Sequence, residues 1–194
     1  MPKLIWKGSA QLSPVPAVLV TCGSAKTPNV LTVAWTGIIC SQPPRTYISV
    51  RPERYSYGLL CETGEFAVNL TTEALLRAAD YCGVRSGREE DKFAACRLET
   101  EPGATIGVPI LAASPVSLEC KIFDRIALGS HEMFLADITA VRVREDCLDA
   151  AGRLSLEKAG LLAYAHGAYH ALGRALGAFG WSVRKKPQKA RRGG

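Results

Sequence analysis

The first two thirds of the chain have the pattern of strands separated by turn residues. The clearest example runs from Val116 to Ile122, where every second residue is apolar and Ser117, Glu119 and Lys121 lie between them. A period of two predicts a β-strand with one buried face and one face toward water. This segment and similar apolar runs bounded by turn residues predict strands at Pro16–Cys22, Val30–Trp35, Thr46–Arg51, Glu65–Leu70, Val116–Phe123 and Met133–Val143.

The last of these strands changes its alternation partway along. Asp137 and Thr139 are polar with one parity, whereas Arg142 and Arg144 are polar with the other. One extra residue in a strand moves all later side chains to the opposite face. The pattern therefore predicts a β-bulge near Ala140.

Helical patterns are fewer. The segment Glu73–Cys82 places apolar residues at helical spacing, and it follows Thr71 and Thr72, which are suitable N-caps. A shorter helix is predicted over Arg88–Ala95, and a third is predicted to begin near Ser155.

Many short strands with few helices between them indicate a mainly β fold. They favour a closed or nearly closed β-barrel with a few peripheral helices over a doubly wound sheet. The sequence has no G-x-G-x-x-G motif, so a Rossmann domain has no support. A length of 194 residues suits one domain.

The positive charge of the chain is concentrated at its end. The segment 184–194 holds six of the 24 Lys and Arg residues; the remaining 18 equal the 18 Asp and Glu residues, so the rest of the chain is neutral. A short basic segment with Pro and Gly is expected to be a disordered tail. Such a tail could contact nucleic acid or an acidic partner, but it has no aromatic residue to stack on a base, so nucleic-acid binding is not favoured.

The cysteines indicate a reducing compartment. Seven is an odd number, and no C-x-x-C pair is present. Several lie in apolar runs, among them Cys22, Cys61 and Cys120. Free thiols are therefore expected in place of disulfides or a zinc site, and no metal is predicted. No signal peptide or membrane-spanning segment is recognisable, so the expected location is the cytoplasm.

Candidate chemistry gathers in SVRPERYSYGLL, residues 49–60. Pro52 ends the strand, and a helical turn is predicted from Tyr55, so free backbone N–H groups are expected beside Arg51 and Ser56. Backbone N–H groups, a guanidinium and a hydroxyl together favour a phosphate. A solvated turn, in which the arginines pair with Glu53 or Glu62, explains the same residues equally well.

Longer segments carry a resemblance that favours the phosphate site. These segments are PNVLTVAWTGIICSQPPRTYISVRPERYSYGLL, GEFAVNL, ADYCGVRSGREEDKF, VSLECKI, LGSHEMFLADI and LLAYAHGAYHALG. In order and spacing they resemble the flavin reductase-like family, and most closely its flavoredoxin branch. The resemblance implies an FMN-binding split β-barrel of Greek-key type over residues 1–183, and a homodimer in which one subunit completes the other's flavin pocket.

The resemblance also implies a ring-binding region. Asn29 and Trp35 would contact the flavin ring, with the backbone N–H groups of Thr36 and Gly37 near a ring carbonyl and Tyr164 covering the ring. Offset aromatic stacking adds about 0.5–1.5 kcal/mol beyond area burial. Apart from the resemblance, Trp35 is as well explained by a barrel core and Tyr164 by packing.

The phosphate end and a catalytic group follow in the same way. Arg51 and Ser56 match the family's phosphate-binding turn, and Lys92 matches a lysine that approaches the flavin or its phosphate; a surface lysine paired with Glu89 is the alternative. His131 is the candidate catalytic and flavin-contacting histidine. Relatives often have Gly-Asp-His where this chain has Gly129-Ser130-His131. The carboxylate that would tune the pKa of the imidazole is therefore absent from the neighbouring position.

Three functions remain in view. The first is a flavoredoxin-like protein that passes electrons through noncovalently bound FMN to a redox protein partner. The second is an NAD(P)H-dependent flavin reductase that supplies reduced FMN. The third, of another class, is a non-enzymatic binding module that uses the basic tail.

Overall fold

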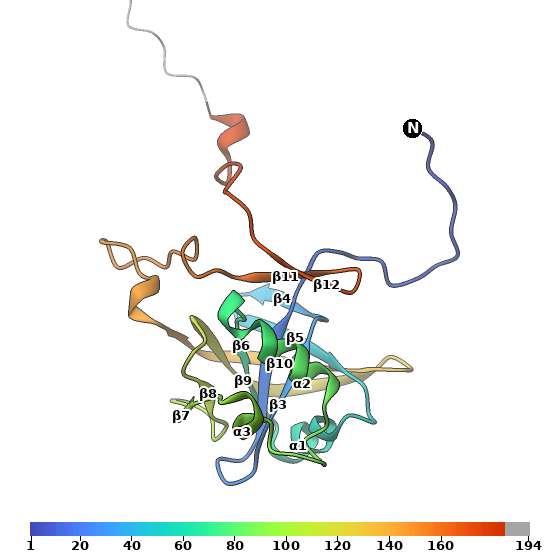
Figure 1. Cartoon of the computed structure of the whole chain (residues 1–194), viewed down its shortest axis with the longest axis vertical. Coiled ribbons are helices and arrows are strands. Elements are labelled where there is room, and N and C mark those ends of the chain that lie inside the picture. Colours follow the sequence, from blue (N-terminus) through green and yellow to red (C-terminus); the bar gives the residue numbers. More distant parts are fainter. Residues whose placement is uncertain (185–194) are drawn as a thin grey trace, which may run out of the picture.

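The computed structural model describes residues 1–184, and its main element is one large antiparallel sheet (Figure 1). The sheet has seven strands in the order β3-β2-β6-β9-β10-β5-β4. Their bounds are β2 (Val18–Gly23), β3 (Pro28–Val33), β4 (Thr36–Ser41), β5 (Pro44–Val50), β6 (Glu65–Asn69), β9 (Val116–Ala127) and β10 (Glu132–Val143). The predicted mainly β fold is confirmed.

The sheet curls without closing. Within residues 1–184 no strand ladder joins its two edges, β3 and β4, so of the two expected forms, closed or nearly closed, the barrel has the nearly closed one. Between β3 and β5 a seam is spanned by one backbone hydrogen bond, in which the Ser49 N–H donates to the Trp35 carbonyl at 2.9 Å. The chain turns at Ala34 and Trp35 to enter β4 after that short interruption. The result is a split barrel with a side opening.

Two smaller sheets were not predicted. One joins β1 (Val15–Pro16), β11 (Leu162–Ala165) and β12 (Ala168–Ala171), and the other joins β7 (Thr100–Glu101) and β8 (Ile110–Leu111). The helix expected near Ser155 is wrong: that segment has no helix, and the Ala-rich region after it forms the β11–β12 hairpin. His166 and Gly167 both have positive φ, 49° and 83°, which suits a two-residue hairpin turn.

The helices of residues 1–184 are α1 (Tyr55–Thr63), the 3-10 helix η1 (Glu73–Leu75), α2 (Leu76–Val84), α3 (Lys92–Cys96) and the short 3-10 helices η2 (Glu145–Cys147) and η3 (Trp181–Val183). The longer helices, α1, α2 and α3, lie against the outside of the sheet, whereas the last short helix stands on the C-terminal arm away from it (Figure 1). Gly64 ends α1 in the left-handed region, where its N–H reaches the Leu60 carbonyl. The helix predicted over Arg88–Ala95 begins later, because the Asp91 carboxylate caps the N–H groups of Phe93 and Ala94.

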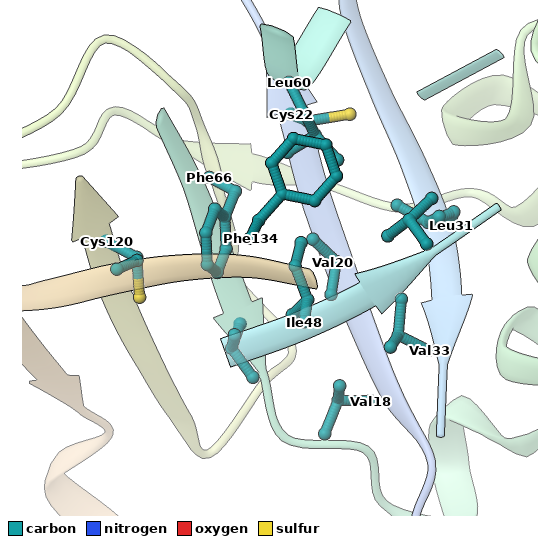
Figure 2. Close-up of a cluster of buried hydrophobic side chains, with 13 residues drawn as sticks. Val18, Val20, Cys22, Leu31, Val33, Ile48, Leu60, Phe66, Cys120 and Phe134 are labelled. Atoms are coloured by element: carbon teal, nitrogen blue, oxygen red, sulfur yellow. The ribbon is translucent and has the colours of Figure 1, made fainter. Parts of the chain in front are cut away.

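The core fills the inside of the curled sheet. Alternate residues of β2 point in opposite directions: Val18, Val20 and Cys22 face the interior, whereas Leu19 faces α2. Figure 2 shows the interior side chains meeting between the strands, with Phe66 and Phe134 among the largest that are fully buried. Each such side chain contributes about 1.5–3 kcal/mol by leaving water.

The predicted bulge lies in β10. Ile138 pairs with Cys120 and Ala140 pairs with Glu119, which leaves Thr139 as the extra residue. The bulge near Ala140 is confirmed. The Thr139 hydroxyl donates to the Glu119 carbonyl, which satisfies one group at the irregular step.

A buried carboxylate fastens the loop before β8. Glu119 is fully buried and accepts the backbone N–H groups of Ala104 and Thr105, at 2.8 and 2.6 Å, as well as the Thr105 hydroxyl. Arg142 stands 3.8 Å away. These donors, with the positive charge of Arg142, outweigh burial and lower the pKa of the Glu119 carboxyl. Glu119 is therefore ionised and stabilises the fold at neutral pH.

One buried hydroxyl has no partner. The Thr71 Oγ1 makes no hydrogen bond within residues 1–184, and Thr71 lines an apolar pocket with Val18, Leu70 and Leu162. Replacing Thr71 with valine keeps the shape and removes the unsatisfied group. We expect Thr71→Val to raise the free energy of unfolding by up to about 1–2 kcal/mol, measured by urea denaturation. A loss of more than 1 kcal/mol would mean that the hydroxyl has a partner in solution.

Candidate functional site

A cleft runs beside the open seam of the barrel. It consists of two adjoining pockets, of about 460 and 150 Å³, which share Leu31, Arg51 and Arg54. The larger pocket lies between β3, the start of α1 and the segment after α2. The smaller pocket extends along the rest of β3 to Trp35 and His131. The cleft therefore has one polar end and one aromatic end.

The polar end is strongly cationic. Arg51, Arg54, Arg85 and Lys92 line it, and Glu53 is the one acidic residue among its lining residues. Glu53 is exposed and contacts Arg51 at 3.4 Å, a surface pair that contributes little. The excess of positive charge is therefore available to an anion in the pocket.

A buried polar group forms the floor of this end. The Asn29 Nδ2 donates to the Ser56 Oγ at 2.7 Å, and both residues are buried. Ser56 lies in the first turn of α1. The backbone N–H groups of this turn lack helical partners, so they are available beside the Ser56 hydroxyl. Burial raises the pKa of the neighbouring Cys22 thiol to about 12, so this thiol stays protonated.

Lys92 is the most unusual side chain of the cleft. It is 4% exposed, and among residues 1–184 its Nζ donates only to the carbonyls of Cys82 and Arg85, at 3.4 and 3.3 Å. No carboxylate within residues 1–184 pairs with it. Burial lowers its pKa. A buried ammonium with two long contacts has hydrogen-bonding capacity left for an anionic ligand.

Gly87 keeps the polar end open. A Cβ at this position would collide with the Asn29 carboxamide and would stand 2.9 Å from the Tyr55 ring. Glycine is required here because backbone and side chains meet closely. The Arg85-Ser86-Gly87 segment therefore closes the pocket with backbone in place of side chain.

At the aromatic end, the rings of Trp35 and His131 are in contact, with centroids 4.4 Å apart and planes tilted by 40°. Trp35 is 45% exposed, so it is not the barrel-core aromatic that its sequence also allowed. Burial, together with the positive charge of Arg51, lowers the pKa of His131 below its ordinary value of 6.5. Its Nδ1 forms a 2.9 Å hydrogen bond with the Ser130 hydroxyl. The imidazole is therefore neutral at pH 7.

Six of the predicted site residues lie in the cleft, and three do not. The six are Asn29, Trp35, Arg51, Ser56, Lys92 and His131. Thr36 and Gly37 lie on β4, where the Thr36 hydroxyl donates to the Tyr47 carbonyl at 2.6 Å. Tyr164 lines a separate pocket of about 290 Å³ with Asp80 and Tyr169. That pocket adjoins the aromatic end, because both include Thr32 and Ala34.

Sequence reasoning missed Arg54, Arg85, Ser86 and Gly87, which also line the polar end. The Arg-Ser-Gly tripeptide was the available signal, since a small polar residue and a glycine after a helix are typical of anion-binding loops. Among the described residues no group of three or more His, Cys, Asp or Glu could hold a metal ion. Nor does any helix in residues 1–184 have the length and apolarity needed to cross a membrane.

The cleft fits an elongated ligand with an anionic group at one end and a flat ring at the other. Cations and free N–H groups would receive the anion, and Trp35 and His131 would contact the ring. A phosphorylated flavin has this form. The donor set and the buried Lys92 therefore agree with FMN.

Comparisons with known proteins agree with this description. The family model for the flavin reductase like domain matches residues 10–173. The structure of flavoredoxin from Desulfovibrio vulgaris (Miyazaki F) is similar, with a TM-score of 0.87 and 32% identity over 94% of this chain and 100% of that one. An FMN-binding protein from Thermus thermophilus has a TM-score of 0.78 and 26% identity over 92% and 99%. An NADPH-flavin oxidoreductase from Streptomyces viridifaciens is 26% identical over 71% of each chain.

Proposed function

Because the chain belongs to the flavin reductase-like family, with a flavin-related redox function, we propose that it binds FMN noncovalently in the seam cleft and passes electrons through it, as a flavoredoxin-like protein. The observation that carries this proposal is the buried Lys92, an ammonium with no carboxylate partner in the described residues at the cationic end of the cleft. A phosphate would supply the missing negative charge.

The phosphate end is assigned to Arg51, Ser56 and Lys92, with Asn29 orienting the Ser56 hydroxyl through their 2.7 Å hydrogen bond. Arginine suits the planar arrangement of phosphate oxygens, and the Ser56 hydroxyl can donate to one of them while it accepts from Asn29. The start of α1 adds backbone N–H groups on the same side. Arg54 and Arg85, which were not predicted from the sequence, also line this end and add positive charge to it.

The ring end is assigned to Trp35 and His131. Bound FMN supplies the redox chemistry, and the protein supplies binding, ring orientation and nearby charge. His131 is proposed to contact the ring as a neutral imidazole held by Ser130. Thr36, Gly37 and Tyr164 do not line this cleft in a single chain, and we propose that some of their contacts with the flavin cross a subunit boundary.

A homodimer is part of the proposal. Ile38 and Ile39 on β4 are 65% and 46% exposed. In addition, β4 is an edge strand, so the backbone groups on its outer side have no partner strand in the described sheet. Residues 2–12 are also exposed and extend away from the barrel (Figure 1), with Leu4, Ile5 and Trp6 among them. Apolar edges of this kind are normally covered by another chain. Trp35 and strand β4 would then lie near a second copy of this chain.

The second candidate is an NAD(P)H-dependent FMN reductase in the cytoplasm. It is supported by an FMN reductase (NADH) from Pseudomonas syringae pv. syringae, 25% identical over 54% of this chain, and by the Streptomyces relative. The carrier is placed first because the flavoredoxin match is more similar and covers that whole chain. The third candidate, a binding module that uses the basic tail, depends on residues outside the described range except Arg184.

Mixing the FMN-loaded protein with NADH or NADPH without oxygen separates the two redox roles. We expect the absorbance of oxidised flavin in the visible range to persist for minutes, since an electron carrier takes electrons from a protein partner. Dithionite should then remove the absorbance, which shows that the flavin is reducible. Rapid loss of colour with either nicotinamide would favour the reductase, and failure to bind FMN at micromolar concentration would contradict both roles.

A further inference from the structure

A second pocket, of about 480 Å³, lies outside the seam cleft. It is formed by η1 and α2 on one side and by α3 and the residues after it on the other. Its volume falls within the range of about 300–1,000 Å³ that is typical of small-molecule sites. Helix α2 separates the two sites: Cys82 lines the seam cleft, whereas Ala78 and Tyr81 line this pocket.

The pocket is cationic with an apolar wall. Arg77 and Arg97 line it, and none of its lining residues is acidic. Neither arginine pairs with a carboxylate within residues 1–184. The Glu90 carboxylate accepts a hydrogen bond from the hydroxyl of the lining residue Tyr81 and lies 3.8 Å from Arg85. The wall consists of Leu75, Ala78 and Leu98.

Arg97 has a strained backbone conformation. It caps α3 with a φ of 54°, in the left-handed region that glycine or asparagine usually fills. Its N–H bonds to the carbonyls of Phe93 and Ala94 fix that conformation. Glycine at this position would end the helix with less strain, so the cap itself does not explain the arginine.

We propose that this pocket is a second ligand site that takes a small organic anion, with its phosphate or carboxylate at Arg77 and Arg97 and its apolar part against Leu75, Ala78 and Leu98. Guanidinium groups bind either anion through paired hydrogen bonds. The apolar wall gives affinity that an inorganic ion would lack. The proposal concerns a separate site and does not depend on FMN binding.

The test is a titration with phenyl phosphate and with benzoate, followed by two-dimensional amide NMR. We expect saturable shifts at the amides of residues 81, 96, 97 and 98 with at least one of these probes, at millimolar concentration or below. Benzyl alcohol, which has the ring without the charge, should give no saturable shift there. The double variant Arg77→Ala/Arg97→Gly should raise the dissociation constant about tenfold or more, because it removes two charge-assisted contacts.

Two further variants keep the result decisive. Arg77→Glu alters an exposed position on α2 and should abolish binding even if the double variant folds poorly. Arg51→Ala, in the seam cleft, should leave the shifts around residue 97 unchanged. The proposal is overturned if neither probe gives a saturable shift, if benzyl alcohol binds equally, if Arg77→Glu has no effect, or if Arg51→Ala removes the response. Phenyl phosphate binding without benzoate would assign the site to phosphates, and the reverse to carboxylates.

Discussion

The double variant Arg51→Ala/Ser56→Ala is expected to bind FMN about a hundredfold to a thousandfold more weakly than the unaltered protein. Both side chains line the cationic end of the seam cleft, where Ser56 is buried and Arg51 is more than half exposed. A hydrogen bond to a charged group contributes about 1.5–3 kcal/mol, and exposure reduces the share of Arg51. Fluorescence titration of FMN measures the change.

Riboflavin provides the internal comparison, because it has the same ring without the phosphate. Its affinity should fall by about tenfold at most, since Arg51 also borders the aromatic end. Arg153→Ala, which removes an arginine paired with Asp149 far along the chain, should leave both ligands unaffected. Equal losses for FMN and riboflavin would show that this turn does not hold the phosphate.

Glu119→Gln is expected to lower the free energy of unfolding by about 2–4 kcal/mol. The change preserves volume, but it removes the negative charge and replaces one carboxylate oxygen with an NH₂ group, which cannot accept a hydrogen bond. With the amide oxygen at the Oε2 position, the NH₂ group would face the Ala104 N–H and Arg142, which are themselves donors, at a buried position. Urea denaturation at pH 7 measures the loss. Glu99→Gln, the same change at an exposed position, should alter stability by less than about 0.5 kcal/mol.

The same carboxylate makes stability depend on pH. Its pKa is lower in the folded chain than in the unfolded chain, so the unfolded chain binds more protons as the pH falls. The contribution of Glu119 is therefore fully present above about pH 5 and is lost as the pH falls through the folded pKa. Glu119→Gln should flatten this acid limb, and an unchanged limb would contradict the assignment.

The fold was predictable where buried and exposed faces alternate. The six predicted strands and the bulge at Thr139 follow from that alternation, because the sheet has one face on the core. Strand β4 was missed because Ile38, Ile39 and Cys40 do not alternate and are mostly exposed. The β11–β12 hairpin was missed because small residues give no periodic signal, and its turn depends on His166 adopting a positive φ.

The site was predictable only in part. Asn29, Ser56 and Lys92 are separated by many residues, and residue spacing alone does not place them together; the family resemblance did. Arg54 and Arg85 were missed because an arginine in a turn is usually a solvated side chain. Thr36, Gly37 and Tyr164 fall outside the cleft because the chain turns away at Trp35 and because β11 packs on β1.

The single hydrogen bond between Ser49 and Trp35 has a consequence for how a large ring enters the protein. At this seam the two halves of the barrel are joined by one backbone contact, whereas every neighbouring pair of strands is joined by several. Local opening of the barrel therefore costs the least free energy at this seam. The ring of the proposed flavin could enter sideways at this seam while the strand ladders stay hydrogen-bonded. The Ser49 amide proton, which is protected only by that contact, would exchange with solvent each time the seam opens.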